Sequence, residues 1–163
     1  MKLTYPLALS SILGTALSAA ILPRDEPIAP NSCCFRLQDT KTGKLAQQDY
    51  NSGFLYVNDP SLPVGWYCLY NDQPILWDTN YNACILTSPK NSFQCLDGTP
   101  GGDTWNIVQS QPNNILLQDY SSVWFSICSV SGRQQIYGPN PPSNLNCQST
   151  QLVAVGRKGQ CKL

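Results

Sequence analysis

The sequence predicts an all-β domain that is cross-linked by disulfide bonds, and three observations carry this prediction. Short apolar or alternating runs recur between clusters of Gly, Pro, Asn, Asp and Ser, which is the pattern of strands joined by tight turns. None of these runs sustains a helical period over three turns. Eight cysteines, an even number, all follow an N-terminal stretch with the features of a secretory signal.

The N-terminal residues 1–20 are predicted to be a signal peptide. Lys2 provides a positive charge, residues 7–17 are apolar or small, and Ser18-Ala19-Ala20 offers the small residues of a cleavage site. The apolar run is too short for a membrane span. Cleavage after Ala20 leaves 143 of the 163 residues.

The remaining chain divides into a lead-in and one domain. Residues 21–32, "ILPRDEPIAPNS", are rich in proline and charge, so we expect a flexible, extended segment. Residues 33–163 are expected to form a single cysteine-rich β domain, since their length suits one modest core.

Twelve candidate strands follow one another in that domain. They are "CFRLQD", "KLAQQ", "GFLYVN", "WYCLY", "PILWD", "ACILT", "SFQCLD", "TWNIVQ", "NILLQD", "VWFSICSV", "RQQIYG" and "QLVAVG". Twelve strands suit a β-trefoil, in which three units of four strands close a small barrel. The segments "FRLQDTKTGKLAQQD" and "NILLQDYSSVWFSIC" share a strand, Gln-Asp, a turn and a second strand. We therefore favour a small closed barrel of the β-trefoil-like kind, with a β-sandwich as the alternative.

The eight cysteines are expected to pair as four disulfide bonds, because an even number in an exported chain is typical of a disulfide framework. The sequence contains no histidine and no C-x-x-C pair, so we expect neither a zinc site nor a redox-active pair. The disulfide-forming residues are Cys33, Cys34, Cys68, Cys84, Cys95, Cys128, Cys147 and Cys161.

Composition argues against two classes of partner. The formal net charge is zero, removal of Lys2 makes the mature chain −1, and the basic residues form no cluster, so nucleic acid is not an expected partner. No segment after residue 20 resembles a membrane span. Charged residues are only 12% of the chain, and Asn, Gln, Ser and Thr must therefore supply much of the polar surface.

The catalytic inventory is poor. Without histidine, the usual general base of Ser and Cys hydrolases is missing. The only glutamate, Glu26, lies in the lead-in, so acid–base chemistry would depend on aspartates, most of which stand in turns. We expect no enzyme activity and no cofactor; a two-carboxylate glycan hydrolase is the remaining catalytic alternative. The domain's aspartates are Asp39, Asp49, Asp59, Asp72, Asp78, Asp97, Asp103 and Asp119.

The glycine-rich stretch "FQCLDGTPGGDTW" has two interpretations. Asp97 and Asp103 could both face a calcium ion, but such sites usually gather more oxygen ligands, and the EF-hand spacing is absent. A phosphate loop would need a following Lys-Ser/Thr and a helix. We favour a turn in which Asp97 and Gly98 begin the reversal and Trp105 returns to the core, and we expect no metal site.

Aromatic residues next to Asn and Asp form the main candidate binding region. Flat rings stack on the apolar faces of sugars while side-chain amides and carboxylates bond their hydroxyls. Two segments, "GWYCLYND" and "LWDTNYN", have this composition and also contain Trp66, Trp77 and Asp78. Trp105 and Trp124 stand inside apolar runs and are expected in the core. The candidate ligand-binding residues are Tyr70, Asn71, Asp72, Asn80 and Tyr81.

The C-terminal half resembles small secreted ascomycete cell-wall proteins of the PhiA-like and IgE-binding kind. The similarity rests on "FQCLDGTPGGDTWNI", "NNILLQDYSSVWFSIC" and "QQIYGPNPPSNLNCQSTQLVAVG", about 60 residues. It implies secretion, association with the wall or with development, no catalytic motif, and a Cys128–Cys147 bridge. The matching positions are Leu116, Leu117, Phe125, Cys128, Ile136, Tyr137, Cys147, Leu152 and Val153.

These observations predict a secreted, non-catalytic, cysteine-rich protein in the extracellular space or the cell wall. We expect a monomer whose partner is a cell-wall polysaccharide or a host surface protein. A host-directed apoplastic effector is the alternative function, because survival among extracellular proteases calls for the same disulfide-based stability. An aspartate-dependent glycan hydrolase is the third hypothesis.

Overall fold

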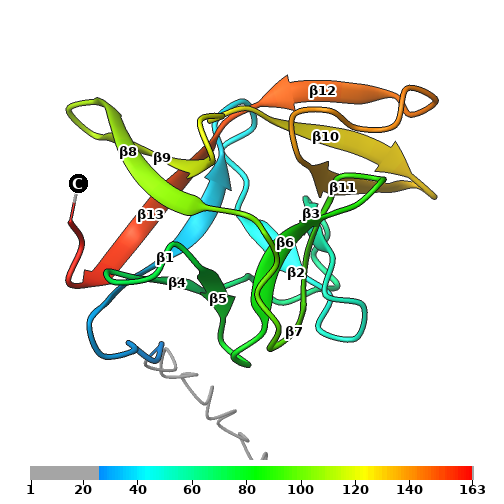
Figure 1. Cartoon of the computed structure of the whole chain (residues 1–163). Coiled ribbons are helices and arrows are strands. Elements are labelled where there is room, and N and C mark those ends of the chain that lie inside the picture. Colours follow the sequence, from blue (N-terminus) through cyan, green and yellow to red (C-terminus); the bar gives the residue numbers. More distant parts are fainter. Residues whose placement is uncertain (1–25, 163) are drawn as a thin grey trace, which may run out of the picture.

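The computed structural model describes residues 26–162, and these residues form strands and turns without any helix (Figure 1). Thirteen strands follow one another along the chain. The first seven are β1 (Ser32–Asp39), β2 (Ala46–Gln48), β3 (Leu55–Val57), β4 (Tyr67–Tyr70), β5 (Leu76–Asp78), β6 (Ala83–Thr87) and β7 (Ser92–Asp97). The others are β8 (Trp105–Gln111), β9 (Asn114–Asp119), β10 (Phe125–Val130), β11 (Arg133–Tyr137), β12 (Cys147–Thr150) and β13 (Leu152–Gly159).

The prediction of an all-β fold is confirmed, while a closed barrel is not shown by the strand pairing. Antiparallel pairing runs in the order β12-β10-β11-β7-β6-β5-β4-β1-β13-β9-β8, and β2 and β3 branch from β11. The two ends of this path, β12 and β8, are not paired with each other. The signal peptide predicted for residues 1–20 lies outside the described residues.

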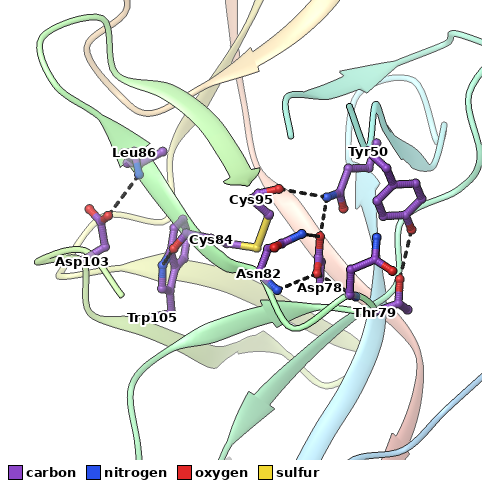
Figure 2. The surroundings of a disulfide bond; sticks show 11 residues. Tyr50, Asp78, Thr79, Asn82, Cys84, Leu86, Cys95, Asp103 and Trp105 are labelled. Carbon is purple, nitrogen blue, oxygen red and sulfur yellow. Dashed lines mark hydrogen bonds between the residues drawn. A yellow bond between two sulfur atoms is a disulfide. The ribbon is translucent and has the colours of Figure 1, made fainter. Parts of the chain in front are cut away.

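One hydrophobic core collects side chains from nearly every strand. Phe93, Trp105 and Phe125 stack at its centre, with ring centroids 4.8 Å apart for Phe93–Trp105 and 5.9 Å for Phe93–Phe125. The indole N–H of Trp105 donates to the carbonyl oxygen of Cys84 at 2.7 Å, so the buried ring keeps its polar atom paired (Figure 2). Trp105 is a core residue as predicted. Trp124 is not: it precedes β10 and is 51% exposed.

All eight cysteines form disulfide bonds. Three bridges join residues that face each other on adjacent strands: Cys34–Cys68, Cys84–Cys95 and Cys128–Cys147. The fourth, Cys33–Cys161, links the start of β1 to the segment after β13. Cys128–Cys147 is the pair implied by the family resemblance. Four disulfides in a chain of this size are typical of extracellular proteins.

The Cys33-Cys34 doublet follows from strand geometry, because neighbouring side chains in a strand point to opposite faces. Cys33 belongs to the main core, and Cys34 belongs to a separate small cluster with Trp66 and Cys68. The doublet therefore fastens β1 on both faces. Among residues 26–162, the structure contains no helix long and apolar enough to cross a membrane.

Candidate functional site

The candidate ligand-binding residues lie on two turns that flank β5. Tyr70 ends β4, and Asn71 and Asp72 begin the turn that leads to β5. Asn80 and Tyr81 belong to the next turn, between β5 and β6. The first turn precedes β5 and the second follows it, so the five residues lie at opposite ends of this strand.

A cavity of about 350 Å³ opens beside the first turn. Three of the five candidate ligand-binding residues, Tyr70, Asn71 and Asp72, line it together with Gln73 and Pro74. Further lining comes from the beginning of β8, from β4 and from the two ends of the domain; these residues are Thr104, Trp105, Asn106, Ile107, Leu69, Cys33 and Lys162. The exposed carboxylate, amide and ammonium groups of this lining give the cavity a polar mouth.

A smaller groove of about 80 Å³, which Tyr70 also lines, is rich in aromatic rings. Trp66, Trp77 and Tyr81 line it, and Tyr81 is 69% exposed. Tyr70 lines the groove as well as the cavity. Asn80 lines neither, so the structure does not join it to the other four candidates.

Asn71 has a structural role that limits its use in binding. Its Nδ2 donates to the carbonyl oxygen of Gln160 at 3.0 Å and to Oδ1 of Asn31 at 3.3 Å, while its backbone N–H donates to the carbonyl oxygen of Asn31 at 3.0 Å. The side chain thus ties the turn to both ends of the domain. Asp72 and Gln73, by contrast, are exposed and are the polar side chains of this turn that face solvent.

Tyr81 is positioned by a buried carboxylate. Asp78, at the end of β5, is only 4% exposed, and its oxygens accept from the backbone N–H of Asn80 at 2.8 Å and of Asn82 at 2.9 Å (Figure 2). Tyr81 itself has a positive φ of 59°, a conformation that non-glycine residues rarely adopt and that the surrounding bonds must hold. Asp78 therefore organises the turn rather than meeting a ligand.

Sequence reasoning did not identify the partner that completes this arrangement. Nε2 of Gln48, on β2, donates to Oδ2 of Asp78 at 2.6 Å across 30 residues of sequence. Gln48 is fully buried, and its Nε2 also lies 3.3 Å from the carbonyl oxygen of Cys95. The only signal in the sequence is a glutamine at an inward position of the run "KLAQQ", and that signal does not name a partner.

The lead-in predicted to be flexible contacts the domain from Glu26 onward. Pro27, Ile28, Ala29 and Pro30 line the aromatic groove. The indole N–H of Trp66 donates to the carbonyl oxygen of Pro27 at 2.8 Å. Residues 21–25 lie outside the described residues.

The glycine-rich stretch forms a turn, as the sequence predicted. Oδ1 of Asp97 accepts from the backbone N–H of Thr99 at 2.7 Å, which is an Asx-type turn. Oδ2 of Asp103 accepts instead from the backbone N–H of Leu86 at 3.0 Å (Figure 2). The two carboxylates therefore serve different parts of the backbone. Among the described residues, no group of three acidic, histidine or cysteine side chains forms a metal-binding cluster.

Asp103 and Asp119 form a second pair of aspartates, and the pKa values of both carboxyls are raised. Burial, and then the charge of Asp103, raises the pKa of Asp119 to about 6, and burial also raises the pKa of Asp103. Oδ1 of Asp119 is buried and has no hydrogen-bond partner. Neither carboxylate lines the cavity or the aromatic groove described above. A glycosidase needs both carboxylates at the scissile bond, so this pair does not favour hydrolysis.

The residues around Tyr70 are consequently the region of the described chain where a cavity, exposed aromatic rings and free polar side chains coincide. Comparison with known proteins adds no family to this description: no family model, curated protein or solved structure matches the chain.

Proposed function

We propose that this chain is a secreted, non-catalytic protein that binds carbohydrate, with a cell-wall polysaccharide as its ligand. The observation that carries the proposal is the position of Tyr70, which lines both the polar cavity and the aromatic groove. An oligosaccharide that spans Tyr70 would meet polar groups in the cavity and aromatic rings in the groove.

The cavity and the groove suit the two kinds of surface that a sugar presents. Trp77 and Tyr81 offer partly or largely exposed rings, which pack against the apolar C–H faces of pyranoses. Asp72 and Lys162 offer charged groups beside the cavity, which bond hydroxyls. A few polar groups in a largely preformed concave site are typical of small-ligand binding.

Secretion and wall association are part of the same proposal. They are supported by the signal-like sequence of residues 1–20, by the four disulfides, and by the resemblance of the C-terminal half to PhiA-like wall proteins.

We also infer a β-trefoil-like arrangement of the strands. Six strands, β1, β4, β5, β8, β9 and β13, would form the barrel, and the hairpins β2–β3, β6–β7 and β10–β11 would cap it. Pairing links these six strands at five of the six required places. At the sixth, the backbone N–H of Trp105 on β8 donates to the carbonyl oxygen of Pro74 beside β5 at 2.8 Å. Three aspartates at equivalent strand ends, Asp39, Asp78 and Asp119, support the threefold repeat.

Binding of the purified mature chain to insoluble chitin, β-glucan and mannan tests the function. We expect retention on at least one of them and a loss of at least tenfold in affinity, about 1.4 kcal/mol, for Tyr70→Ala. Tyr70→Phe, which keeps the ring, should lose less. Tyr120→Ala is the matched control, because Tyr120 is an exposed tyrosine on a different turn.

Two results would contradict the proposal. One is the absence of retention on all three polysaccharides by the folded chain. The other is an equal loss for Tyr70→Ala and Tyr120→Ala, since that would place binding away from the cavity and groove.

A further inference from the structure

The segment Glu26–Asn31 lies outside the disulfide-bridged part of the chain but is held on it by side-chain contacts. It forms no strand. Its Pro27 carbonyl oxygen accepts the indole N–H of Trp66 at 2.8 Å, and Ala29 packs against the cluster of Cys34, Trp66 and Cys68. These are the contacts of an extended peptide on an aromatic surface, where an indole N–H bonds a backbone carbonyl.

The first residue of the segment is recognised by charge. The carboxylate of Glu26 accepts from both Nε and Nη2 of Arg36, with Nε at 2.8 Å, and lies 3.9 Å from Nζ of Lys158. Nζ of Lys158 in turn lies 5.8 Å from the centre of the Trp66 ring. Two cations from β1 and β13 thus face one carboxylate, next to the indole that binds the following residue.

Ile28, in the middle of the segment, lies next to Gly159, which has no side chain. Cγ2 of Ile28 lies 2.9 Å from the position where a Cβ on Gly159 would stand. Gly159 has a φ of 86°, so a larger residue is disfavoured there by conformation as well as by contact. The glycine makes room for a branched apolar residue two positions after the acid.

The segment joins the domain through a single elbow. Asn31 has a φ of 53°, and its carbonyl oxygen accepts from the backbone N–H of Asn71. Oγ of Ser32 donates to the carbonyl oxygen of Ala29 at 2.5 Å. Among the described residues, the segment is covalently joined to the domain at Asn31–Ser32, and its contacts from Glu26 to Ala29 are those that a separate peptide could make.

We propose that the surface formed by Arg36, Trp66, Lys158 and Gly159, called here the lead-in surface, is a peptide-binding site. It accepts an extended peptide of another protein in which an acidic residue directly precedes a proline. The chain's own Glu26-Pro27-Ile28-Ala29 occupies it in cis, and a partner peptide replaces this segment. The charge complementarity between one carboxylate and two cations selects the partner. Neither Tyr70 nor Asp72 belongs to this surface, but the surface adjoins the proposed carbohydrate site, because Trp66 and residues 27–30 also line the aromatic groove.

The test uses the intact mature chain and a fluorescent peptide with the sequence of residues 24–31. In Glu26→Arg, repulsion from Arg36 and Lys158 releases the chain's own segment while the lead-in surface stays unchanged. We expect this variant to bind the peptide at least tenfold more tightly than the wild-type chain, whose surface is occupied. A control peptide with glutamine in place of the acidic residue should bind Glu26→Arg at least tenfold more weakly. Adding Arg36→Gln to Glu26→Arg should remove a similar amount of affinity.

A milder variant protects the test against misfolding. Glu26→Gln removes only the charge, and we expect an intermediate affinity with a thermal midpoint close to that of the wild-type chain. The proposal is overturned if folded Glu26→Arg or Glu26→Gln binds the peptide no better than the wild-type chain. Equal binding of the two peptides overturns it too, because the acid would then have no role. Loss of polysaccharide binding in Tyr70→Ala does not affect either outcome.

Discussion

Asp39 and Asp119 each end a strand whose last three residues are Leu-Gln-Asp, yet the pKa of Asp39 is lowered and the pKa of Asp119 is raised. Asp39 ends β1, Asp119 ends β9, and the exposed fractions of the two residues are 0% and 7%. Burial acts on both in the same direction, because it disfavours the charged form. The difference must come from the donors around them.

The turn after β1 provides donors. Oδ2 of Asp39 accepts from the backbone N–H of Thr42 at 2.9 Å and from its hydroxyl at 2.6 Å, and Oδ1 accepts from the hydroxyl of Thr150 on β12. Burial would raise the pKa of Asp39, but the bonds from Thr150, Thr42 and the backbone of Lys41 outweigh it and lower the pKa. The charged form of this carboxylate is stabilised, and both of its oxygens accept hydrogen bonds.

The turn after β9 provides fewer hydrogen-bond donors to the carboxylate of Asp119. Its residues reverse the chain tightly through reciprocal backbone bonds between Asp119 and Ser122, and no side chain donates to Oδ1 of Asp119. Burial and the neighbouring charge of Asp103 prevail over the backbone N–H groups of Thr104 and Tyr120, so the pKa rises to about 6. The comparison shows that the donors around the carboxylate, which for Asp39 come from the following turn and from β12, decide whether it stabilises this fold.

The largest expected effect is that of Asp39→Ala. It leaves the hydroxyls of Thr42 and Thr150 without their acceptor. Each buried donor left unsatisfied costs about 1–3 kcal/mol, so we expect a loss of about 3–5 kcal/mol. Urea unfolding at pH 7 with the disulfides intact measures this free energy. Asp97→Ala is the control, because Asp97 is exposed and makes one turn bond, worth about 1 kcal/mol or less. Equal losses for the two variants would contradict the role given to Asp39.

Asp119→Asn should increase the free energy of unfolding at neutral pH, in contrast to Asp39→Ala. Because the native pKa of Asp119 is about 6 and that of an unfolded aspartate is about 3.9, the folded protein binds more protons than the unfolded chain between these values. The free energy of unfolding therefore falls as the pH rises through this window and is fully reduced above about pH 6. Asparagine carries no charge, so the variant should be more stable than wild type at pH 7. A difference of about 2 pKa units corresponds to about 3 kcal/mol, and solvent screening of this partly buried carboxylate reduces the expected gain to about 2 kcal/mol.

The pH profile separates this explanation from a simple packing change. Near pH 4 the wild-type carboxyl is protonated in the folded state, and the gain from Asp119→Asn should largely disappear. Asp39 contributes the opposite slope, since its lowered pKa gives stability that is lost as the pH falls below about 4. A gain from Asp119→Asn that is the same at pH 4 and pH 7 would show that the charge of Asp119 is not responsible.

The sequence was sufficient to locate the strands because period-two alternation and turn residues are local signals. Each of the twelve predicted runs overlaps one of the observed strands. The strand that the sequence did not predict is β12, Cys147–Thr150, whose residues Cys-Gln-Ser-Thr have no apolar alternation. It is held by its pairing with β10 and by the Cys128–Cys147 bridge, and neither contact is visible in its own composition.

Only those features of the candidate site that depend on residues adjacent in the sequence could be predicted. Tyr70 and Asp72 were found because an aromatic residue and a carboxylate adjoin in a turn, and both line the cavity. The tie between Asn71 and Gln160 spans 89 residues, and the bond from Gln48 to Asp78 spans 30. Such pairs depend on how the strands meet in three dimensions, so the sequence offered Asn71 as a ligand-binding residue although its amide is engaged within the fold. The same limit explains Trp124, which stands in an apolar run but lies ahead of the strand and faces solvent.

The smallest expected effect is that of Asp103→Asn, which tests how much the charge of Asp103 raises the pKa of Asp119. Asparagine keeps an oxygen that accepts from the backbone N–H of Leu86, but it removes the charge that faces Asp119. The pKa of Asp119 should then fall while staying above its ordinary value, because burial is the larger cause of its shift. The stability gain at pH 7 should be roughly 0.5–1 kcal/mol, a fraction of one pKa unit. Carboxyl chemical shifts in an NMR titration report the pKa of Asp119 directly. If that pKa does not move, Asp103 is too distant to matter, and the contrast between Asp39 and Asp119 rests on the missing donors alone.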